Sequence, residues 1–425
     1  LLGGMMRYGI PDYRLHQEVI QKEIDWLLDH GITAFTSTEL GKDICLDEIR
    51  ERHNAVLLAM GCWGSSSMRA KGEDLPGVIS GIEFLHSVNT GKPMEIGQKV
   101  AVIGGGNTAM DACRCAKRTG AEEVSIIYRR TRDEMPAENI EIEEAMEEGI
   151  NFIFLASPRS VEGNGKAETL VCEKMELGEA DASGRRRPVP TGETFELQVD
   201  NVIAAIGQKI DFSGLPESIH DAKKMIIDDD YATPLPGVFV CGDQQTGPKI
   251  AIEAIGNGHW AAESIDCFIQ TGKAKKPFVY DIIREDLGPE DFLDIEKQPR
   301  EKLEHVPAEK RLNEPFVEYN KGLTEEQVLK DASRCMECGC PDVFECKLRK
   351  YATDYEVEPE RVAGEHISKF EEANEYYIRN MDKCILCGRC VRACDEIAGF
   401  HAIDFAKRGF SSVMSPEFFE PVESS

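Results

Sequence analysis

The sequence predicts an α/β protein with Rossmann-like parallel sheets, followed by a small, mainly helical, cysteine-rich domain. Three observations support this prediction. Strand and helix patterns alternate over residues 99–157, a glycine-rich turn joins the first strand of that region to its first helix, and eight of the 15 cysteines form two tight groups near the C-terminal end. Alternation of this kind is typical of a parallel sheet covered by helices.

The predicted elements follow one another in a βαβαβ order. KVAVIG, TAMDACRCAKRTG, EVSIIYR, an acidic helix through EEAMEEG, and NFIFLAS occupy residues 99–157. Two strand patterns in residues 168–207 flank the turn-rich GRRRPVPTGE and predict an antiparallel excursion. Residues 237–272 add the strand GVFVCGD and an amphipathic helix, and residues 273–322 have the Lys, Pro and Glu content of a linker.

The bulk composition bounds the function classes. A chain of 425 residues with 41% hydrophobic content predicts two to four domains. A formal charge of −28 argues against nucleic-acid binding, which needs a basic face. No apolar run approaches the roughly 18 residues of a membrane span, and the start LLGGMMRYG lacks the features of a signal peptide. We therefore expect a soluble, cytoplasmic protein.

The turn in VAVIGGGNTAMD carries a dinucleotide-binding pattern. Gly104, Gly106 and Ala109 follow G-x-G-x-x-A after a strand and at the start of a helix. Glycines allow a tight turn and close backbone approach, and the N–H groups of a helix N-terminus bind a pyrophosphate. The sequence therefore predicts a nicotinamide dinucleotide at this turn.

The next strand indicates which nucleotide is bound. An NAD site usually has an acidic residue at this strand end, about 20 residues after the glycines. Here the strand ends as Tyr128-Arg129-Arg130-Thr131-Arg132. Guanidinium groups suit a phosphate better than a ribose hydroxyl, so we expect NADP rather than NAD, the alternative being that these arginines are solvated surface residues.

A second nucleotide is suggested by PLPGVFVCGD, where Gly242 and Asp243 end a buried strand and a helix follows a Gly-Pro turn. In a flavoprotein with two dinucleotides, such an aspartate hydrogen-bonds the ribityl chain of FAD and the next helix directs its N-terminus at the flavin. The alternative is an ordinary turn.

The cysteine groups have the spacing of metal ligands. The downstream group follows C-x2-C-x2-C-x3-C, which wraps three thiolates around an iron–sulfur cube; the residue after it is Asp395 rather than proline, so the role of the fourth cysteine stays open. The downstream cysteines are Cys384, Cys387, Cys390 and Cys394. The upstream cysteines, spaced C-x2-C-x-C-x5-C, are Cys335, Cys338, Cys340 and Cys346.

Clustering of this kind favours metal ligation in a reducing compartment over disulfides. We expect two iron–sulfur clusters of the 4Fe-4S type. Structural zinc, which also binds four thiolates, is the alternative for either group, and free reduced cysteines are a further one.

Residues 1 to about 272 resemble the small subunit of NADPH-dependent glutamate synthase and its relatives. The motifs that carry the resemblance, in order, are GGMMRYGIPDYRL, VLLAMGCWGSS followed by GEDLPGV, VIGGGNTAMD, YRRTRDEMPA, VIAAIGQ and the VCGD stretch. The resemblance implies an FAD domain interrupted by an NADPH domain, with hydride passing from nicotinamide to flavin.

The resemblance also implies the binding residues. Those at the flavin are Gly3, Gly4, Gly242, Asp243 and Ile250. Those at the NADPH diphosphate are Gly104, Gly106, Asn107, Thr108 and Ala109. Those at the 2′-phosphate are Arg129 and Arg130.

One feature of the family is missing from the sequence. Relatives carry an FAD-binding G-x-G-x-x-G element immediately before the equivalent of LLGGMMRYG, and this chain starts at Leu1 without it. We expect either that the native protein is longer or that another chain supplies the binding site for the ADP half of FAD.

The cysteine-rich region has resemblances of its own. NKGLTEEQVLKDASRCMECGC is similar to the iron–sulfur domain that the glutamate synthase family carries at its N-terminus. NMDKCILCGRCVRACDEIAGFHAIDFAKRGF resembles the cluster region of complex I large-subunit, iron hydrogenase and formate dehydrogenase relatives.

These patterns together predict the domain organisation. We expect a two-dinucleotide-binding-domain flavoprotein, with the NADP domain inserted in a partial FAD domain, plus the iron–sulfur domain. The predicted boundaries are 1–95 and 209–275 for the partial FAD domain, 96–208 for the NADP domain, 276–322 for a linker, and 323–425 for the iron–sulfur domain.

The predicted function is that of an electron-transfer subunit between NADPH, FAD and iron–sulfur clusters, which requires no acid–base pair or activated nucleophile. Its expected partner is a ferredoxin or a subunit of glutamate synthase large-chain, hydrogenase, formate dehydrogenase or transhydrogenase type. The alternatives are a non-catalytic iron–sulfur relay subunit and a zinc-bearing NADP-binding regulator.

Overall fold

The computed structural model divides the chain into two compact units. The first contains residues 1–277 and 301–327, and the second contains residues 278–300 and 328–425. The residues described are 2–180, 186–278, 288–293, 296–314, 316–318, 320–335, 345–358, 361, 371–373, 378–381 and 384–416.

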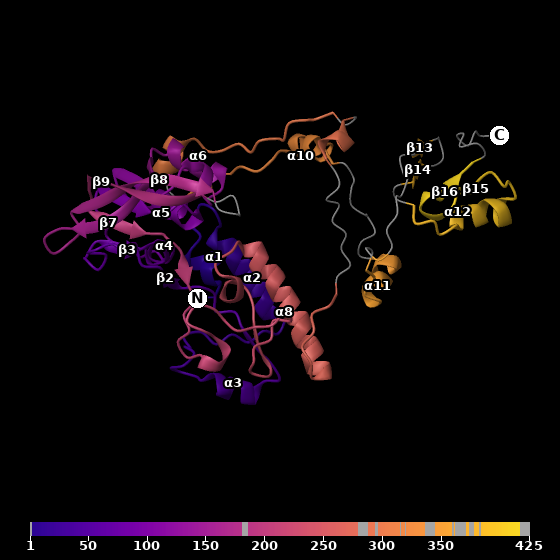
Figure 1. Ribbon diagram of the computed structural model, residues 1–425, viewed down its shortest axis with the longest axis horizontal. Helices are drawn as coiled ribbons and strands as arrows, with labels where there is room; N and C mark the ends of the chain where they lie inside the picture. The colour runs from indigo at the N-terminus through magenta and orange to yellow at the C-terminus, as the bar shows by residue number, and fades with distance from the viewer. Residues whose placement is uncertain are drawn as a thin grey trace. The chain divides into compact units, whose positions relative to one another are not determined.

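A five-stranded parallel sheet is the centre of the first unit (Figure 1). Its strands, in spatial order, are β3 (Val78–Ser80), β10 (Asn201–Ala204), β4 (Lys99–Ile103), β5 (Glu123–Tyr128) and β6 (Asn151–Phe154). The register places Val102 opposite both Ile126 and Ile203. These β-branched side chains suit a sheet that is buried on both faces.

Successive side chains of β4 point to opposite faces of this sheet and enter two different cores. Val100 and Val102 pack in the core that includes the helical residues Phe84 and Met110. The helices on this face are α4 (Gly81–Asn89), α5 (Asn107–Arg118) and α6 (Asn139–Glu147). Ser80 caps α4, since its hydroxyl accepts a hydrogen bond from the Glu83 N–H at 3.5 Å.

The opposite face packs on the predicted antiparallel excursion. Ala101 and Ile103 join a core with Leu170 and Cys172 of this second sheet. The second sheet consists of β7 (Ala156–Glu162), β8 (Thr169–Ala180) and β9 (Arg186–Gln198), all antiparallel. The β8–β9 pair reaches the end of β5, where Arg130 Nε donates to the Arg186 carbonyl at 3.2 Å.

A smaller parallel pair, β1 (Val56–Leu58) and β12 (Val238–Val240), lies in the part of the unit predicted to bind flavin. Its side chains join a core with Leu46 and Ile219. The long helix α8 (Ala251–Thr271) packs on β12 through a ring contact of 5.6 Å between Phe239 and Phe268.

Shorter elements complete the first unit. The helices are α1 (Gly4–Tyr8), α2 (Gln17–Asp29), α3 (Leu46–Arg52), α7 (Asp243–Thr246), α9 (Ala308–Asn313) and the 3-10 turns Arg132–Glu134 and Glu217–Ile219. The antiparallel pair β2 (Gly64–Ser65) and β11 (Gln208–Lys209) links the two sheet regions.

The segment predicted as a linker divides between the two units. Residues 301–327 belong to the first unit, where Val306 joins the main core and Arg311 of α9 is 2% exposed. One buried valine produces no hydrophobic periodicity, so the sequence did not predict that this segment packs on the first unit. We call residues 301–314 the strap.

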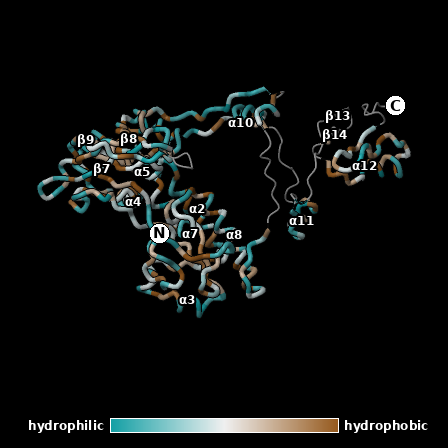
Figure 2. Tube along the Cα trace, viewed as in Figure 1, coloured by the Kyte–Doolittle hydropathy of each residue, from teal (hydrophilic) through white to brown (hydrophobic). Residues whose placement is uncertain are grey.

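The second unit contains short elements. These are the 3-10 helix Pro289–Phe292, α11 (Lys347–Asp354), β13 (Glu371–Ala373) paired with β14 (Ile378–Asn380), α12 (Arg389–Arg392), a π-helix (Ala393–Ala398), the 3-10 turn Gly409–Ser411, and β15 (Asp404–Ala406) paired with β16 (Val413–Ser415). Helix α10 (Glu325–Ala332) spans residues of both units. Hydrophilic residues dominate α11, as Figure 2 shows. No helix within the described ranges combines the length and hydrophobicity needed to cross a bilayer.

Candidate functional site

The glycine-rich turn after β4 has a shape that only glycine permits. Gly104 has φ 144°, and a Cβ there would lie 2.2 Å from the Ala205 carbonyl oxygen. A Cβ on Gly105 would lie 2.6 Å from the Tyr128 ring, whereas one on Gly106 would meet nothing nearer than Pro136 at 3.9 Å. Protein atoms therefore fill the space beside Gly104 and Gly105, whereas the space beside Gly106 is free. A diphosphate needs close backbone approach at this last glycine.

Helix α5 begins directly at this turn. The N–H groups of Ala109 and Met110 donate to the Gly106 carbonyl at 2.9 and 3.2 Å, while Thr108 in the first turn is half-buried. Asn107 Oδ1 is buried and has no hydrogen-bond partner among the described residues. A buried acceptor without a partner is costly in a folded protein, so this atom marks a position where a bound group with a donor fits.

The loop after β5 folds back over the glycine turn. Tyr128 donates its hydroxyl hydrogen to the Glu134 carbonyl at 2.7 Å, and the Ala137 N–H donates to the Gly105 carbonyl at 3.1 Å. Thr131 and Glu134 form a capping box, which holds the Glu134 carboxylate against the loop. The two parts of the predicted NADP site are thus adjacent in the structure.

The two predicted specificity arginines have different environments. Arg129 is exposed, whereas Arg130 is 7% exposed and its Nε donates to the Arg186 carbonyl at 3.2 Å. Arg186 is the first residue of β9, so the hairpin reaches the predicted 2′-phosphate position. Sequence reasoning did not find this residue, because its only signal was membership of a basic turn.

The predicted flavin residues lie at turns with left-handed or extended backbones. Gly3 and Gly4, with φ 117° and 53°, begin α1. Gly242 has φ 65° and precedes Asp243, the first residue of α7. Ile250, immediately before α8, is 54% exposed.

Asp243 is fixed by hydrogen bonds around the ends of β1 and β12. Its Oδ1 accepts from the Lys249 N–H at 3.1 Å, and its carbonyl accepts from the Cys62 thiol at 3.2 Å. Burial raises the pKa of the Asp243 carboxyl above its usual range. Gln244 Oε1 accepts from the Met60 N–H at 3.1 Å, which ties α7 to the segment after β1.

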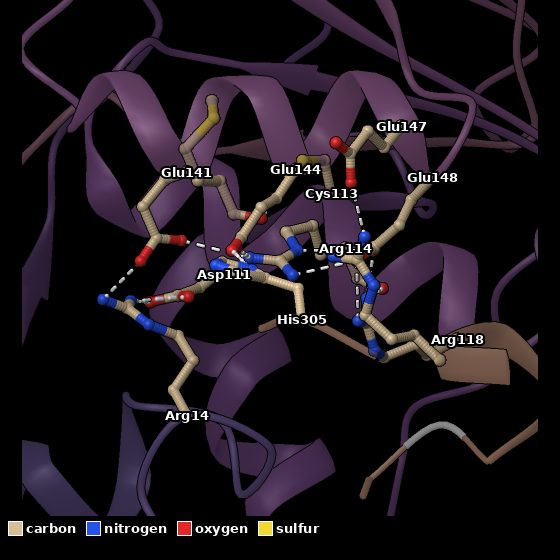
Figure 3. A network of polar contacts seen from close by, with 12 residues as sticks. Arg14, Asp111, Cys113, Arg114, Arg118, Glu141, Glu144, Glu147, Glu148 and His305 are labelled. Atoms are coloured by element: carbon tan, nitrogen blue, oxygen red, sulfur yellow. Dashed lines mark hydrogen bonds and ion pairs between the residues drawn. The ribbon is translucent and has the colours of Figure 1, made fainter. Parts of the chain in front are cut away.

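A buried network of charged side chains joins α5 to α6, as Figure 3 shows. Arg114 is fully buried and pairs with three carboxylates, two on α6 and one on the residue that follows it, at 2.8 to 3.2 Å. These carboxylates belong to Glu141, Glu144 and Glu148. Arg118 also pairs with Glu148. Such a network satisfies each buried charge with an opposite one.

The network also binds two segments outside the sheet. Arg14 pairs with Asp111 of α5 at 2.8 Å, and Glu144 pairs with His305 of the strap at 2.9 Å (Figure 3). Arg311 of the strap pairs with Glu148 at 3.1 Å. The first segment of the chain and the strap are therefore both attached to the two helices of the nucleotide-binding sheet.

The cysteine groups are only partly described. Cys338 and Cys340 lie outside the described residues. Among the residues that the structure describes, no three His, Cys, Asp or Glu side chains converge to hold a metal ion. Three predicted ligand sulfurs accept backbone N–H groups. These bonds join Cys346 to Arg349 at 3.4 Å, Cys384 to Leu386 at 3.4 Å and Cys394 to Ala402 at 3.1 Å.

Backbone N–H groups that point at sulfur stabilise thiolates and tune the clusters that thiolates ligate. Leu386 and Gly388, between three of the cysteines, have φ 55° and 70°, a left-handed backbone that curves the loop tightly. The donor set and the loop both fit an iron–sulfur cluster.

Comparison with known protein families agrees with this geometry. Residues 5–258 match the family described as pyridine nucleotide-disulphide oxidoreductase, and residues 376–424 match the ferredoxin-like domain of NADH-quinone oxidoreductase subunit 3. The chain belongs to the pyridine nucleotide-disulphide oxidoreductase family. It has the α/β fold of two-dinucleotide-binding flavoproteins with a ferredoxin-like region at its C-terminal end, which confirms the predicted fold class.

Individual relatives support the same assignment. The chain is 35% identical over 381 residues to the NADPH-Fe(3+) oxidoreductase subunit beta of Geobacter sulfurreducens, covering 79% of this chain and 56% of that protein. It is 39% identical over 351 residues to the NADP(+)-dependent formate dehydrogenase subunit beta of Moorella thermoacetica, covering 79% and 49%. The chain thus spans about half the length of these two curated relatives.

The predicted resemblance to glutamate synthase small chains is confirmed. The small chain of Azospirillum brasilense glutamate synthase is 33% identical over 297 residues, covering 65% of this chain and 61% of that one. Among solved structures, Mycobacterium tuberculosis FprA in complex with NADPH has a TM-score of 0.54 at 22% identity, covering 63% of this chain and 74% of FprA. The likeness to FprA concerns the fold alone.

Proposed function

We propose that this chain is an NADPH-linked electron-transfer subunit that passes electrons between NADPH, FAD and two iron–sulfur clusters of the 4Fe-4S type. Its acceptor or donor is a partner subunit or a ferredoxin in a reducing, cytoplasmic compartment. The observation that carries the proposal is the presence, in one chain, of an open glycine turn before α5 and of cysteine loops near the C-terminal end whose sulfurs accept backbone N–H groups.

The proposed nicotinamide nucleotide binds at the turn. The diphosphate lies against Gly104, Gly106 and the start of α5, where the helix N-terminus favours negative charge. The partnerless Asn107 Oδ1 accepts from the bound nucleotide. The 2′-phosphate lies at the arginine-rich end of β5, which favours NADP over NAD.

The proposed flavin contacts come from the two glycine turns and from α8. Gly3 and Gly4 approach the ring system closely, and Asp243 accepts from the ribityl chain. Bound FAD would supply the exchange between a two-electron hydride and single electrons. The chain's own part is to place the nicotinamide beside the ring, to exclude water with Ile250, and to hold the charge of Asp243 in place through the Lys249 N–H.

Eight cysteines hold the clusters in this proposal. The downstream four have N–H donors to two sulfurs in the structure, and the upstream group has one. The named relatives indicate the class of partner: the names of two of them describe beta subunits of an Fe(3+) oxidoreductase and of a formate dehydrogenase. We propose a partner of the same multisubunit type.

The test is NADPH-dependent reduction of a one-electron dye by the full chain, purified without oxygen and supplied with FAD. The proposal predicts dye reduction with NADPH, retained flavin, and bound iron and sulfide. Iron and sulfide without NADPH-dependent dye reduction would instead indicate a relay subunit, and equimolar zinc in a colourless protein would indicate a nucleotide-binding regulator.

A further inference from the structure

The β8–β9 hairpin brings an additional arginine to the end of β5. Arg130 Nε donates to the Arg186 carbonyl at 3.2 Å, across 56 residues of sequence. The same loop is anchored on its other side, because the Leu155 N–H donates to the Arg130 carbonyl at 3.1 Å. The Arg186 backbone is therefore held at the strand end where dinucleotide-binding sheets recognise the adenosine ribose.

The arginines at this position differ in what they offer a ligand. The Arg130 side chain is buried and donates to the hairpin backbone, while Arg129 and Arg186 are both exposed. Arg186 donates from Nε to the Gly178 carbonyl at 3.2 Å and from Nη2 to the Leu177 carbonyl at 3.4 Å. A guanidinium has five N–H groups in a rigid fork, so these two bonds orient the side chain and leave others for an anion.

The positive charge of Arg186 acts on the carboxylate of Glu134 in the loop. The pKa of Glu134 is lowered below its usual range, first by the hydrogen bond from the Thr131 hydroxyl and further by the positive charge of Arg186. Thr131 also donates its backbone N–H to Glu134 at 3.1 Å. The Glu134 carboxylate is thus engaged by Thr131, whereas Asp133 in the same loop is exposed. Arg129 and Arg186 bring two exposed positive charges to this strand end.

We propose that Arg186 is a specificity-determining residue that binds the adenosine 2′-phosphate together with Arg129. Arg130 is a positioning residue, which acts by holding the hairpin. This inference rests on the proposed function, because it assigns a ligand to the same nucleotide site.

A basic hairpin residue is more often a solvated surface group, and the neighbouring Arg187 provides the comparison. Arg187 is exposed as well, and it follows Arg186 on the same strand. Side chains alternate along a strand, so Arg187 points to the opposite face of the sheet. Of these two residues, Arg186 is the one whose backbone accepts a hydrogen bond from Arg130 among the contacts of the described residues.

The experiment is calorimetric binding of 2′,5′-ADP and of 5′-ADP to the full chain, to Arg186→Gln and to the matched control Arg187→Gln. Both probes contain adenosine with phosphate at its 5′ position, but only 2′,5′-ADP has the 2′-phosphate. Loss of a charge-assisted contact predicts that Arg186→Gln weakens 2′,5′-ADP binding on the order of ten-fold or more. The control variant should bind both probes as the unchanged chain does, and 5′-ADP binding should be unaffected by either substitution.

Three results would overturn the inference. Equal binding of 2′,5′-ADP by Arg186→Gln and the unchanged chain would remove Arg186 from the site and leave the proposed function intact. Equal weakening by Arg187→Gln would show a diffuse charge effect. Absence of binding of both probes to the unchanged chain would contradict the proposed function itself. Arg186→Lys, which keeps the charge but lacks the fork, should fall between the unchanged chain and the glutamine variant.

Discussion

Arg311 Nη1 donates to the Glu148 carboxylate at 3.1 Å, although 163 residues separate the two in the sequence. Arg311 is 2% exposed and Glu148 is also bound by Arg114 and Arg118. Because these charges are buried together, the strap is attached to the end of α6 by an ion pair that water does not screen. The strap, residues 301–314, is therefore held against the helices that cover the five-stranded sheet.

Removing the Arg311 charge should detach the strap. Arg311→Met keeps most of the apolar stem but removes the bonds from the strap to Glu147 and Glu148, although Glu148 stays paired with Arg114 and Arg118. Loss of hydrogen bonds to a charged group costs about 1.5 to 3 kcal/mol. We expect a lower free energy of unfolding in urea, and faster amide hydrogen exchange in residues 301–314.

The matched control is Lys310→Met, on the same helix but with an exposed side chain 3.9 Å from the Glu314 carboxylate. An exposed pair contributes little, so this variant should behave like the unchanged chain. Similar exchange rates for the two variants would show that the ion pairs of Arg311 do not hold the strap.

Asp111 should make stability depend on pH in the acidic range. Burial raises its pKa to about 6 despite the opposing effect of Arg14, and Glu141 nearby adds to the rise. Its pKa in an unfolded chain is about 3.9. Between these values the folded state holds more protons than the unfolded state, so this contribution to stability falls as the pH rises from about 4 to about 6, by on the order of 2 kcal/mol.

Asp111→Asn has no such proton to lose. We expect its free energy of unfolding to decline less steeply from pH 4 to pH 6 than that of the unchanged chain, measured by urea titrations at each pH. Parallel curves for the two proteins would contradict the raised pKa.

Gly104→Ala should abolish binding of the nicotinamide nucleotide. The added Cβ would lie 2.2 Å from the Ala205 carbonyl oxygen, and φ 144° disfavours any L side chain. The turn must move, which displaces the start of α5. The control is Gly258→Ala in α8, where a Cβ meets no atom within 4 Å. NADPH titration should show no binding for the first variant and unchanged binding for the second.

Cys390→Ala should remove one iron–sulfur cluster, since the C-x2-C-x2-C-x3-C spacing predicts Cys390 as one of its ligands. The control is Cys267→Ala, a cysteine of α8 whose sulfur lies 3.7 Å from the Thr271 hydroxyl. Iron and sulfide analysis should show about half of the normal content in the first variant and all of it in the second. Full iron content in Cys390→Ala would contradict the predicted ligand set.

The sequence allowed the succession of strands and helices in residues 99–157 to be predicted, because its periodicity is strong. β4, α5, β5, α6 and β6 all occur where KVAVIG through NFIFLAS indicates them. The charged network was not predicted, although the spacing of Glu141, Glu144 and Glu148 places all three on one face of a helix. An acidic face is usually solvated, and its burial depends on Arg114 and Arg311, which come from other segments.

The site shows the same division. The glycine turn could be predicted because its backbone geometry limits residue choice locally. The contribution of Arg186 could not, since it depends on the pairing of β8 with β9 and on a hydrogen bond to a residue 56 positions away. Long-range pairings of this kind leave no local pattern.

The most direct test of the account is electron paramagnetic resonance of the full chain after anaerobic addition of NADPH and FAD. If the chain carries electrons from the nucleotide to the cysteine loops, signals of reduced iron–sulfur clusters should appear with NADPH and should be weaker with NADH at equal concentration. Clusters that dithionite reduces but NADPH leaves unchanged would contradict the central claim that one chain joins the two sites.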